Sequence, residues 1–370
     1  MNPDVILKEL TSLPTASAAE QRVIAWIEQW AEKNKLDLKR DRYGNLLISG
    51  PGAVKTNKPL LITAHMDHPA FVVNKKLGKN KVIGEFRGGV DKPYFVGSRV
   101  RIVTADGDAK GVVVSVGNKP PEPWSRFRVT VELDAPCDAI APGDVMVWDL
   151  PATTIDGDVV RGPAFDDLAA GSGAIAAFET LLKKHPETLA YTRLLFTRCE
   201  EIGFVGAIGA CKANLIPKGA RIVALETSKS FPESPIGGGP IVRVGDRTSI
   251  FDQELTYRVT AIAEALAKRT AKRKSPFRFQ RKLMPGGTCE ATAYQVYNRI
   301  ATCVCIPLGN YHNMNESRGA IDSEQISLND FHLLIEFLVE IARQIDAGGE
   351  AMSLHSKIEQ IWEARRELLE

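Results

Sequence analysis

The hydrophobic positions of the first 36 residues recur with the spacing of amphipathic helices. Residues 4–36 contain two such segments separated at Pro14, and the second places four apolar side chains on one helical face. Two short apolar runs follow at residues 46–50 and 59–65, and runs of this length are typical of buried strands. The chain is therefore predicted to begin with two helices and to continue into a sheet.

The pattern changes between about residue 75 and residue 155. Short β-rich runs there alternate with Gly and Pro, as in RVRIVTADG, GVVVSVG, FRVTVEL and DVMVWDL. This texture predicts a small β-barrel or sandwich inserted into another domain.

Strands and helices alternate after residue 155. The expected strands are 192–197, 221–227 and 301–308, and the expected helices are 166–185, 206–215, 251–270 and 328–346. Such alternation indicates a largely parallel sheet covered on both faces. The predicted fold class is therefore α/β, with a mostly parallel central sheet, helices on both faces and an inserted small β-barrel domain. We expect a discontinuous main domain, residues 1–74 and 156–370, around an inserted β-rich domain, residues 75–155.

The composition is that of a folded chain without a strong charge bias. Of the 370 residues, 44% are apolar and 25% are charged, and the formal net charge is +2. A balanced charge gives no general attraction to nucleic acid or to membranes. The amino terminus lacks the apolar core of a signal peptide, and no segment has the roughly 18 apolar residues of a spanning helix. We therefore expect a cytoplasmic protein whose six cysteines are reduced and mostly buried.

Side chains that suit metal binding or proton transfer follow each apolar run. In chain order they are His65, Asp67, Asp166, Asp167, Glu200, Glu201, Glu226 and His312. In open α/β sheets, ligands bind beyond the carboxyl ends of the strands. Five separate segments are therefore predicted to deliver carboxylates and imidazoles to one edge of the sheet.

Each of these residues also has an ordinary structural explanation. A single histidine such as His65 or His312 is more often a core residue, Asp166 and Asp167 could cap the helix that begins there, and Glu226 could lie on a surface loop. These explanations leave the convergence of five segments unexplained. Carboxylates gathered at one edge repel one another and lose hydration, and a bound cation offsets both costs.

The ligand types indicate which metal would bind. Two imidazoles with three carboxylates suit zinc, cobalt or manganese better than calcium or magnesium. Five ligand segments and a spare acid could serve two ions, which would clamp the oxygens of a hydrolytic transition state and lower the pKa of a bridging water. Because neighbours on a strand point to opposite faces, we expect one of Glu200 and Glu201 to bind metal and the other to handle the proton of the water.

Four motifs resemble those of the dinuclear metallo-aminopeptidases. They are HMD at 65–67, GPAFDDLAAGSG at 162–173, TRCEEIGFVGA at 197–207 and NYH at 310–312. The segments FRGGVDKPYFVGSRVRI and IAPGDVMVWDLPATTIDGDVVRGPAFDD resemble more closely the tetrahedral aminopeptidases, metallopeptidase family forty-two. The resemblance covers nearly the whole chain.

The resemblance implies a metal ligand in every motif. One ion would be held by His65, Asp166 and Glu226, and the other by Asp166, Glu201 and His312. Asp166 would bridge the two ions, and the peptide bond that follows it would be cis.

The resemblance also implies two roles beside the metals. Glu200 would be the general acid and base of the reaction. Asp67 would accept the second N–H of His65 and thereby fix the tautomer of that ring.

Some positions depart from the family pattern. Glu226 stands where these aminopeptidases usually have Asp, and Glu at this place is familiar from related carboxypeptidases and acyl-amino-acid hydrolases. His68 and Pro69 replace an acid and a small residue, and Cys289 and Glu290 lie where relatives have an Asp-containing loop. We therefore expect an altered substrate pocket.

A basic segment, residues 267–282, raises a different class of function. It concentrates Lys and Arg around two phenylalanines, a composition found in nucleic-acid-binding patches. A solvated helix end followed by an exposed strand explains the same pattern, and we favour that explanation because the overall charge is balanced.

Taken together, the residues and the resemblance predict a metallo-aminopeptidase that carries two divalent ions per subunit, zinc or cobalt, and trims amino-terminal residues from short peptides. The alternative among related enzymes is a carboxypeptidase or an N-acyl-amino-acid hydrolase, and the alternative outside enzymes is a basic-patch binding protein. We expect a homo-oligomer, because the resemblance implies a closed shell of twelve subunits, and we expect no nucleic-acid or membrane partner.

Overall fold

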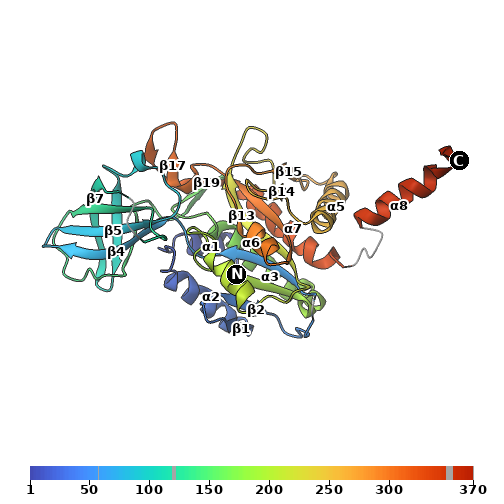
Figure 1. Ribbon diagram of the computed structural model, residues 1–370, viewed down its shortest axis with the longest axis horizontal. Coiled ribbons are helices and arrows are strands. Elements are labelled where there is room, and N and C mark those ends of the chain that lie inside the picture. Colours follow the sequence, from blue (N-terminus) through green and yellow to red (C-terminus); the bar gives the residue numbers. More distant parts are fainter. Residues whose placement is uncertain (57, 119–121, 347–352, 370) are drawn as a thin grey trace.

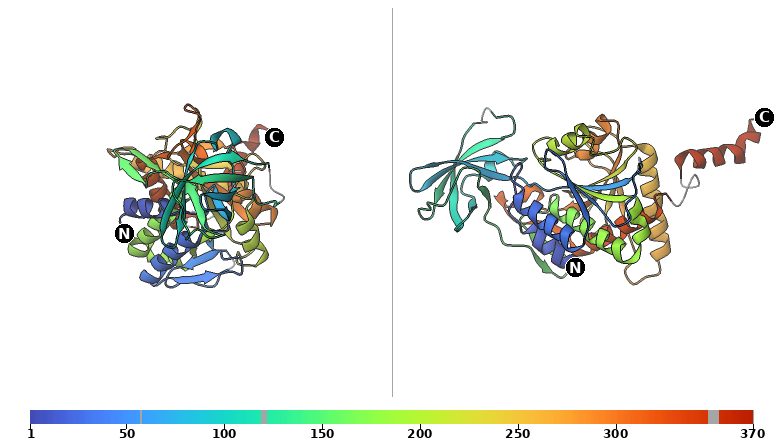
Figure 2. Two further views of the ribbon diagram at one scale, coloured as in Figure 1. Left: turned by 90° about the vertical axis from the view of Figure 1, so that its left-hand side faces the viewer. Right: turned by 90° about the horizontal axis from the view of Figure 1, so that it is seen from below.

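The computed structural model describes residues 1–56, 58–118, 122–346 and 353–369. These residues form an elongated molecule (Figure 1). A β-barrel lies at one end, a sheet flanked by helices lies in the middle, and a single helix projects at the other end. Figure 2 shows the same order of parts from below.

An eight-stranded sheet forms the centre of the main domain. Its strand order is β1 (Asp37–Arg40), β2 (Leu46–Ser49), β12 (Thr192–Thr197), β3 (Leu60–His65), β13 (Arg221–Lys229), β16 (Ile300–Leu308), β14 (Ile241–Gly245) and β15 (Gln280–Leu283). The four central strands β12, β3, β13 and β16 are parallel, whereas β2 runs antiparallel to β12 and β14 runs antiparallel to β16. The predicted parallel sheet is confirmed at its centre, and its outer strands make the whole sheet mixed.

Parallel pairing aligns the carboxyl ends of the central strands. Leu60 at the start of β3 pairs with Thr192 of β12 and with Arg221 of β13, and His65 at the end of β3 pairs with Thr197. The residues that follow these strands therefore emerge at one edge of the sheet.

Helices cover both faces of the sheet, because successive side chains of a strand point to opposite sides. On β3, Leu60 and Ile62 belong to one apolar core and Leu61 belongs to the other. The first core is shared with α1 (Pro3–Thr11), α2 (Gln21–Lys33), α3 (Leu168–Lys184), α5 (Gln253–Thr270) and α7 (Leu328–Gln344). The second core is covered by α4 (Val205–Lys212) and α6 (Glu290–Val296). These two cores confirm the α/β class.

The inserted block is a closed barrel and not a sandwich. Its strand order is β4 (Ala70–Leu77), β5 (Lys81–Arg87), β8 (Phe127–Leu133), β7 (Gly107–Val116), β6 (Arg99–Thr104) and β9 (Val145–Trp148). Aromatic rings fill its interior, where the ring of Phe71 lies 4.7 Å from that of Trp148 and 4.8 Å from that of Phe86. Both pairs meet edge to face, the arrangement that aromatic quadrupoles favour.

A three-stranded sheet connects the barrel to the main domain. It consists of β10 (Thr154–Asp156), β11 (Val159–Gly162) and β19 (Glu324–Ser327), and the hairpin β17 (Met314–Asn315) and β18 (Ala320–Ile321) precedes β19. β11 pairs antiparallel with β19, so that Gly162 lies opposite Glu324. This pairing brings the loop that contains Asp166 next to Glu324.

The basic segment 267–282 spans the end of α5 and the strand β15. The side chain of Phe277 is only 3% exposed and packs against Phe337, with the ring centroids 5.5 Å apart. Arg269 and Arg273 form ion pairs with glutamates of α7. These contacts favour the helix-end explanation of the segment.

Three further features concern the cysteines, membrane spans and the carboxyl-terminal helix. All six cysteines are free thiols, and four of them are buried. Within the described ranges, no helix has both the length and the apolar character needed to cross a membrane. The helix α8 (Leu354–Arg365) projects from the main domain (Figure 1), and the backbone N–H of Leu354 donates to Glu254 Oε2 of α5 at 3.0 Å.

Candidate metal centre

Five segments meet at the carboxyl edge of the sheet, as the sequence predicts. His65 ends β3, Glu226 lies on β13, and Glu200 and Glu201 follow β12. The other two residues come from loops: Asp166 precedes α3, and His312 lies in the turn after β16. All of these side chains are buried or nearly so.

Asp166 lies between the two imidazoles. Its Oδ1 is 3.4 Å from His65 Nε2, and its Oδ2 is 3.3 Å from His312 Nε2. Glu201 Oε1 is also 3.3 Å from His312 Nε2. Two three-residue groups share Asp166, one with His65 and Glu226 and one with Glu201 and His312, and the ligand atoms within each group lie within 4.8 Å of one another.

The electrostatics of the cluster are those of a site built for a cation. Burial raises the pKa of Glu200 and of Glu226, because it removes the hydration of the carboxylates, and repulsion from neighbouring carboxylates raises both pKa values further. Burial opposes ionisation of Asp166 as well, but the adjacent imidazoles of His312 and His65 outweigh it and hold the pKa of Asp166 below its ordinary value. Among the described residues, Asp166 Oδ1 and His312 Nε2 are buried atoms without a hydrogen-bond partner. Buried oxygen and nitrogen atoms without a hydrogen-bond partner, in a cluster of carboxylates and imidazoles, fit the ligand set of a divalent ion.

The outer nitrogen of each imidazole is held by a backbone carbonyl. His65 Nδ1 lies 3.0 Å from the carbonyl oxygen of Asp67, and His312 Nδ1 lies 2.8 Å from that of Gly89. Each ring therefore turns its Nε2 toward the cluster, since a donating Nδ1–H leaves Nε2 as the free lone pair. The carboxylate of Asp67, expected to make this contact, is farther from His65 Nδ1, at 3.5 Å.

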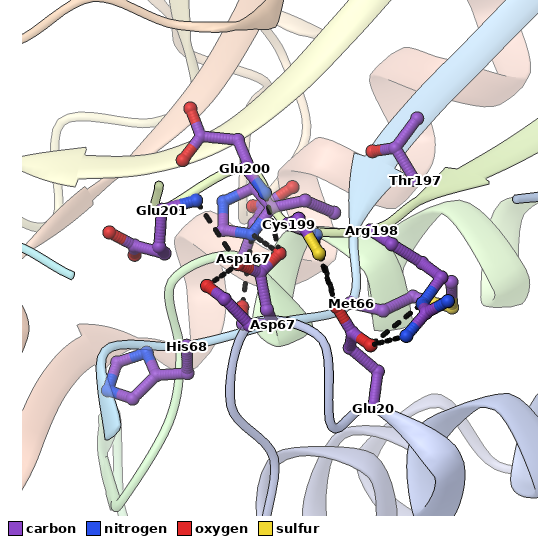
Figure 3. Close-up of polar contacts among 12 residues, drawn as sticks. Glu20, Met66, Asp67, His68, Asp167, Thr197, Arg198, Cys199, Glu200 and Glu201 are labelled. Carbon is purple, nitrogen blue, oxygen red and sulfur yellow. Dashed lines mark hydrogen bonds and ion pairs between the residues drawn. The ribbon is translucent and has the colours of Figure 1, made fainter. Parts of the chain in front are cut away.

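The carboxylate of Asp67 instead anchors the turn that carries the two glutamates. It accepts hydrogen bonds from the backbone N–H groups of Glu200 (2.9 Å) and Glu201 (3.1 Å) and from the hydroxyl of Ser17 (2.5 Å) (Figure 3). Three donors on one fully buried carboxylate fix the turn relative to the HMD motif. Asp67 therefore acts on both glutamates through the backbone.

Glu20 fixes the start of the same turn. It is fully buried and accepts hydrogen bonds from Arg198 Nε (2.8 Å) and from the backbone N–H of Cys199 (3.1 Å), with Arg198 Nη2 at 2.7 Å (Figure 3). Cys199 has a φ of 55°, a conformation that non-glycine residues rarely adopt. The anchor on either side holds the backbone in this shape.

Asp167, next to the central carboxylate of Asp166, bonds to the strand β13. The peptide bond between Asp166 and Asp167 is cis, as the resemblance implies. Asp167 occupies the N-cap position of α3 but accepts no hydrogen bond from the helix, and its Oδ1 accepts one from Thr227 Oγ1 at 3.0 Å. The alternative that Asp167 caps the helix with its side chain is therefore wrong.

Two further acids lie close to the site: sequence reasoning missed Glu324, and it noted Glu290 only as a departure from the family pattern. Glu324 is fully buried and accepts hydrogen bonds from the backbone N–H groups of Phe165 (2.5 Å), Asp166 (3.3 Å) and His312 (2.9 Å). Glu290 begins α6 and is 3% exposed, and burial raises its pKa to about 7. Neither acid stands at the end of a central strand, so the rule that found the other acids could not find these.

Two cavities meet above the cluster. One of about 220 Å³ is lined by Asp166, Glu200, Glu201 and Glu226. A smaller one of about 50 Å³ shares Glu226, Thr288 and Tyr311 with it and continues to Arg243. The cluster is therefore open to a small substrate.

Arg243 lies in the wall of the smaller cavity. Its side chain is 3% exposed and donates to Ser228 Oγ at 3.1 Å. Within the described parts of the chain its Nε has no hydrogen-bond partner. Burial opposes its charge, but nearby groups that include the carboxylate of Glu226, which lines the same cavity, raise its pKa. An anionic group of a ligand would give this buried guanidinium a direct partner.

Comparison with known proteins agrees with this geometry. Among solved structures, a TET aminopeptidase from a marine sediment archaeon of the Thaumarchaeota is 20% identical, with a TM-score of 0.77 over 93% of this chain and 96% of that chain. The TET1 peptidase of Pyrococcus horikoshii is 22% identical, with a TM-score of 0.75 over 92% of this chain and 99% of that chain. An aminopeptidase from the archaeon Desulfurococcus kamchatkensis is 22% identical, with a TM-score of 0.73 over 92% and 94% of the two chains. These likenesses establish the shared fold.

A family model matches most of the sequence. The model described as M42 glutamyl aminopeptidase covers residues 44–327, which is more than half of the chain and includes every residue of the cluster. On this match, the chain belongs to the M42 glutamyl aminopeptidase family.

Proposed function

We propose that the chain is a dinuclear metal-dependent aminopeptidase that removes amino-terminal residues from short peptides. Membership of the family makes it a peptide hydrolase. The observation that carries the dinuclear proposal is the position of Asp166, which presents one carboxylate oxygen to each of two imidazoles. A carboxylate placed in this way can bridge two cations.

Three groups of the described residues could hold an ion, and the two that share Asp166 are the proposed ligand groups, whereas the third combines Glu200 with His65 and Glu201. His65, Asp166 and Glu226 would hold one ion, and Asp166, Glu201 and His312 would hold the other. The mixture of imidazole and carboxylate suits zinc or cobalt. Two such ions, when bound, supply Lewis acidity toward the scissile carbonyl and lower the pKa of water.

Glu200 is the residue that would move the proton. It lies beside the ligands but belongs to neither group that shares Asp166. Burial raises its pKa, so that it can accept a proton from the attacking water and pass it to the leaving amine nitrogen. The backbone contact with Asp67 would hold it in position for both transfers.

Arg243 supports removal of an acidic amino-terminal residue. The larger cavity is lined by proposed metal ligands and by Glu200, so the scissile bond of a peptide would lie there. Arg243 in the smaller cavity would bind a carboxylate on the first side chain, so that the buried guanidinium gains a direct partner. We therefore propose that peptides beginning with Glu or Asp are the preferred substrates.

A carboxypeptidase or an N-acyl-amino-acid hydrolase is the second candidate. Arg243 could bind the terminal carboxylate of such a substrate, and the presence of Glu226 instead of Asp is the sequence feature that favours this reading. The family match favours the aminopeptidase.

A panel of substrates tests the proposal. We expect hydrolysis of glutamyl and aspartyl anilides, weaker hydrolysis of leucyl anilide, and none of N-acetylated glutamyl anilide or of acyl-amino acids. Chelation should abolish activity, and zinc or cobalt should restore it. The Arg243→Met variant should lose the preference for acidic residues while it retains activity on leucyl anilide. Hydrolysis of acyl-amino acids alone would contradict the aminopeptidase reading.

A further inference from the structure

His68 follows the HMD motif but does not face the substrate. It is 4% exposed and lines neither cavity above the cluster. Both of its ring nitrogens are engaged: Nδ1 lies 2.6 Å from the carbonyl oxygen of Asp166, and Nε2 lies 3.0 Å from Asn313 Oδ1. A ring with both nitrogens occupied is not free to carry a proton to a substrate. His68 therefore contacts the supports of the cluster and not the cavities above it, where we had expected it to alter the substrate pocket.

The orientation of Asn313 explains the second contact. Its Nδ2 donates to the carbonyl oxygen of Pro163 at 3.0 Å, which leaves Oδ1 to face His68. Both contacts of His68 therefore require a ring N–H as the donor. Through them, His68 joins the loop that carries Asp166 to the turn that carries His312.

The turn that is held in this way has an unusual backbone. His312 and Asn313 have φ angles of 55° and 63°, in the left-handed region that side chains other than glycine rarely adopt. Such a conformation persists only where surrounding contacts enforce it. Asn313 is fully buried, and its side chain is bonded on both sides.

Glu324 joins the same two segments at a second point. Its carboxylate accepts from the N–H of His312 and from the N–H groups of Phe165 and Asp166. His68 and Glu324 thus tie the Asp166 loop to the His312 turn from two sides. The 3.3 Å separation of Asp166 Oδ2 and His312 Nε2 depends on these ties.

We propose that His68 is a positioning residue, which holds Asp166 against His312 and so sets the affinity of the metal centre without touching substrate. This inference rests on the proposed function, in which both residues are ligands. Outer partners of metal ligands typically contribute about 10–100-fold in affinity. His68 contacts the backbone of Asp166, which would serve both ions, and the side chain of Asn313, the neighbour of His312, which would serve one ion.

Two substitutions separate the two contacts of the His68 ring. The amide nitrogen of asparagine is as many bonds from Cα as Nδ1 of histidine, and that of glutamine is as many as Nε2. His68→Asn should therefore keep the contact with Asp166 and lose that with Asn313, which loosens His312 and weakens one ion. His68→Gln should keep Asn313 and release Asp166, which serves both ions, so that both are weakened. His68→Ala loses both contacts and should show the full loss of about 10–100-fold.

The measurement is calorimetric titration of the chelator-treated chain with zinc, and separately the kcat and KM for glutamyl anilide at saturating zinc. In the His68 variants we expect weaker zinc binding, recovery of kcat to within about threefold at saturating zinc, and an unchanged KM. His332→Ala is the control: this exposed histidine pairs with Asp4 on α1 and should leave zinc binding unchanged.

Several outcomes would overturn the proposal. Unchanged zinc affinity in all three His68 variants, even with a lower melting temperature, would show that His68 is only structural. A loss of kcat that saturating zinc does not restore would place His68 in the chemistry itself. Failure of the unaltered chain to bind any divalent ion would contradict the proposed function, and it would be seen before any variant is compared.

Discussion

At the scale of single residues, Glu200 and Glu201 are neighbours with different surroundings. Both backbone N–H groups bond to Asp67, and the two side chains leave the turn in different directions (Figure 3). Glu201 Oε1 lies 3.3 Å from His312 Nε2, whereas burial, with repulsion from Glu201 and Asp67, raises the pKa of Glu200. Under the proposed function, the same backbone anchor would serve a metal ligand and a proton carrier.

Amide substitutions distinguish these two roles. Glu200→Gln keeps the size of the side chain but cannot accept a proton, so kcat should fall by about 100- to 10,000-fold while metal content stays unchanged. Glu201→Gln places a neutral amide beside His312, so one ion should be lost and activity should partly return with excess metal. Elemental analysis and turnover of both purified variants give the comparison.

Other results for metal content and turnover would contradict these roles. If Glu200→Gln loses metal and Glu201→Gln does not, the two roles are exchanged. If both variants retain full activity, the chain does not use this cluster for hydrolysis.

Glu290 gives a prediction for pH. Burial raises its pKa to about 7, so the folded chain holds this proton more tightly than the unfolded chain does. The resulting stability is complete below a pH of about 4.5 and is lost as the pH rises to about 7, by an amount on the order of 3 kcal/mol. Glu290→Gln has no proton to lose and can still accept from Tyr294.

The measurement compares urea unfolding of both proteins after chelation, at several pH values between 4.5 and 8. Relative to the variant, the unaltered chain should lose stability between pH 4.5 and 7 and change little above that range. Glu264→Gln, at an exposed position on α5, is the control and should run parallel to the unaltered chain. Parallel curves for Glu290→Gln as well would mean that Glu290 is already ionised in the folded chain.

The sequence located the residues at strand ends but not those that support them. His65, Glu226 and the acids after β12 follow long apolar runs, so parallel pairing alone brings them together. Glu20 and Glu324 act by accepting backbone N–H groups of segments far away in the chain. No local sequence pattern predicts such a contact, because the residues around a buried acid do not indicate which distant backbone N–H group it binds.

At the scale of elements, the long helices and the central strands follow from periodicity, and the short elements do not. α6 has only seven residues, and β14 carries the charged Arg243 in its middle, so neither reaches the length or apolar pattern that identifies an element. β14 is buried nonetheless, because it pairs with β16 at the side of the sheet. The edge strand β1 was missed for the same reason, whereas β2 coincides with the apolar run predicted at residues 46–50.

The packing of α4 against the end of β12 gives a prediction at this scale. A Cβ added at Gly206 would lie 2.1 Å from the carbonyl oxygen and 2.5 Å from the backbone nitrogen of Arg198. Backbone atoms cannot give way as a flexible side chain can, and Arg198 leads directly into the turn of Glu200. Gly206→Ala should therefore cost about 3 kcal/mol of stability and reduce activity.

Gly171→Ala is the matched control for this substitution. Its added Cβ would meet Ala64 at 3.4 Å, an ordinary contact, within the long helix α3. The expected change in the free energy of unfolding is within about 1 kcal/mol, and the helix favours Ala over Gly. Equal stability of the Gly206 and Gly171 variants in urea unfolding would show that α4 can move away from Arg198 without loss.

At the scale of the whole molecule, the barrel and the sheet domain contribute to one site. The carbonyl oxygen of Gly89, in the segment between β5 and β6, accepts from His312 Nδ1. An added Cβ at Gly89 would lie 3.3 Å from that ring, a tighter contact than most Cβ atoms make, so glycine lets the segment lie against the ring without displacing it. The inserted block therefore orients one of the two imidazoles, and we propose that residues 75–155 are more than a platform for assembly.

The last prediction concerns assembly and the helix α8. A similar structure is described as a dodecamer, and the TET1 peptidase of Pyrococcus horikoshii can assemble into a tetrahedron or a large octahedral shell. The match covers 99% of each of these neighbours but only 92% of this chain. The neighbours therefore form their shells without a counterpart of the unmatched 8% of this chain. Among the described residues, α8 contacts the main domain through few side chains, and its Ile358 and Trp362 are 54% and 50% exposed.

We therefore expect the chain to form a symmetric homo-oligomer, and a chain that ends at Asp346 to form one with the same number of subunits. Light scattering coupled to size exclusion measures both masses against the 40.5 kDa of one chain. A full-length chain of 40.5 kDa at every concentration would contradict the oligomer. If only the shortened chain falls to the mass of a single subunit, α8 holds the subunits together, because its exposed apolar residues would then be covered by a neighbouring copy.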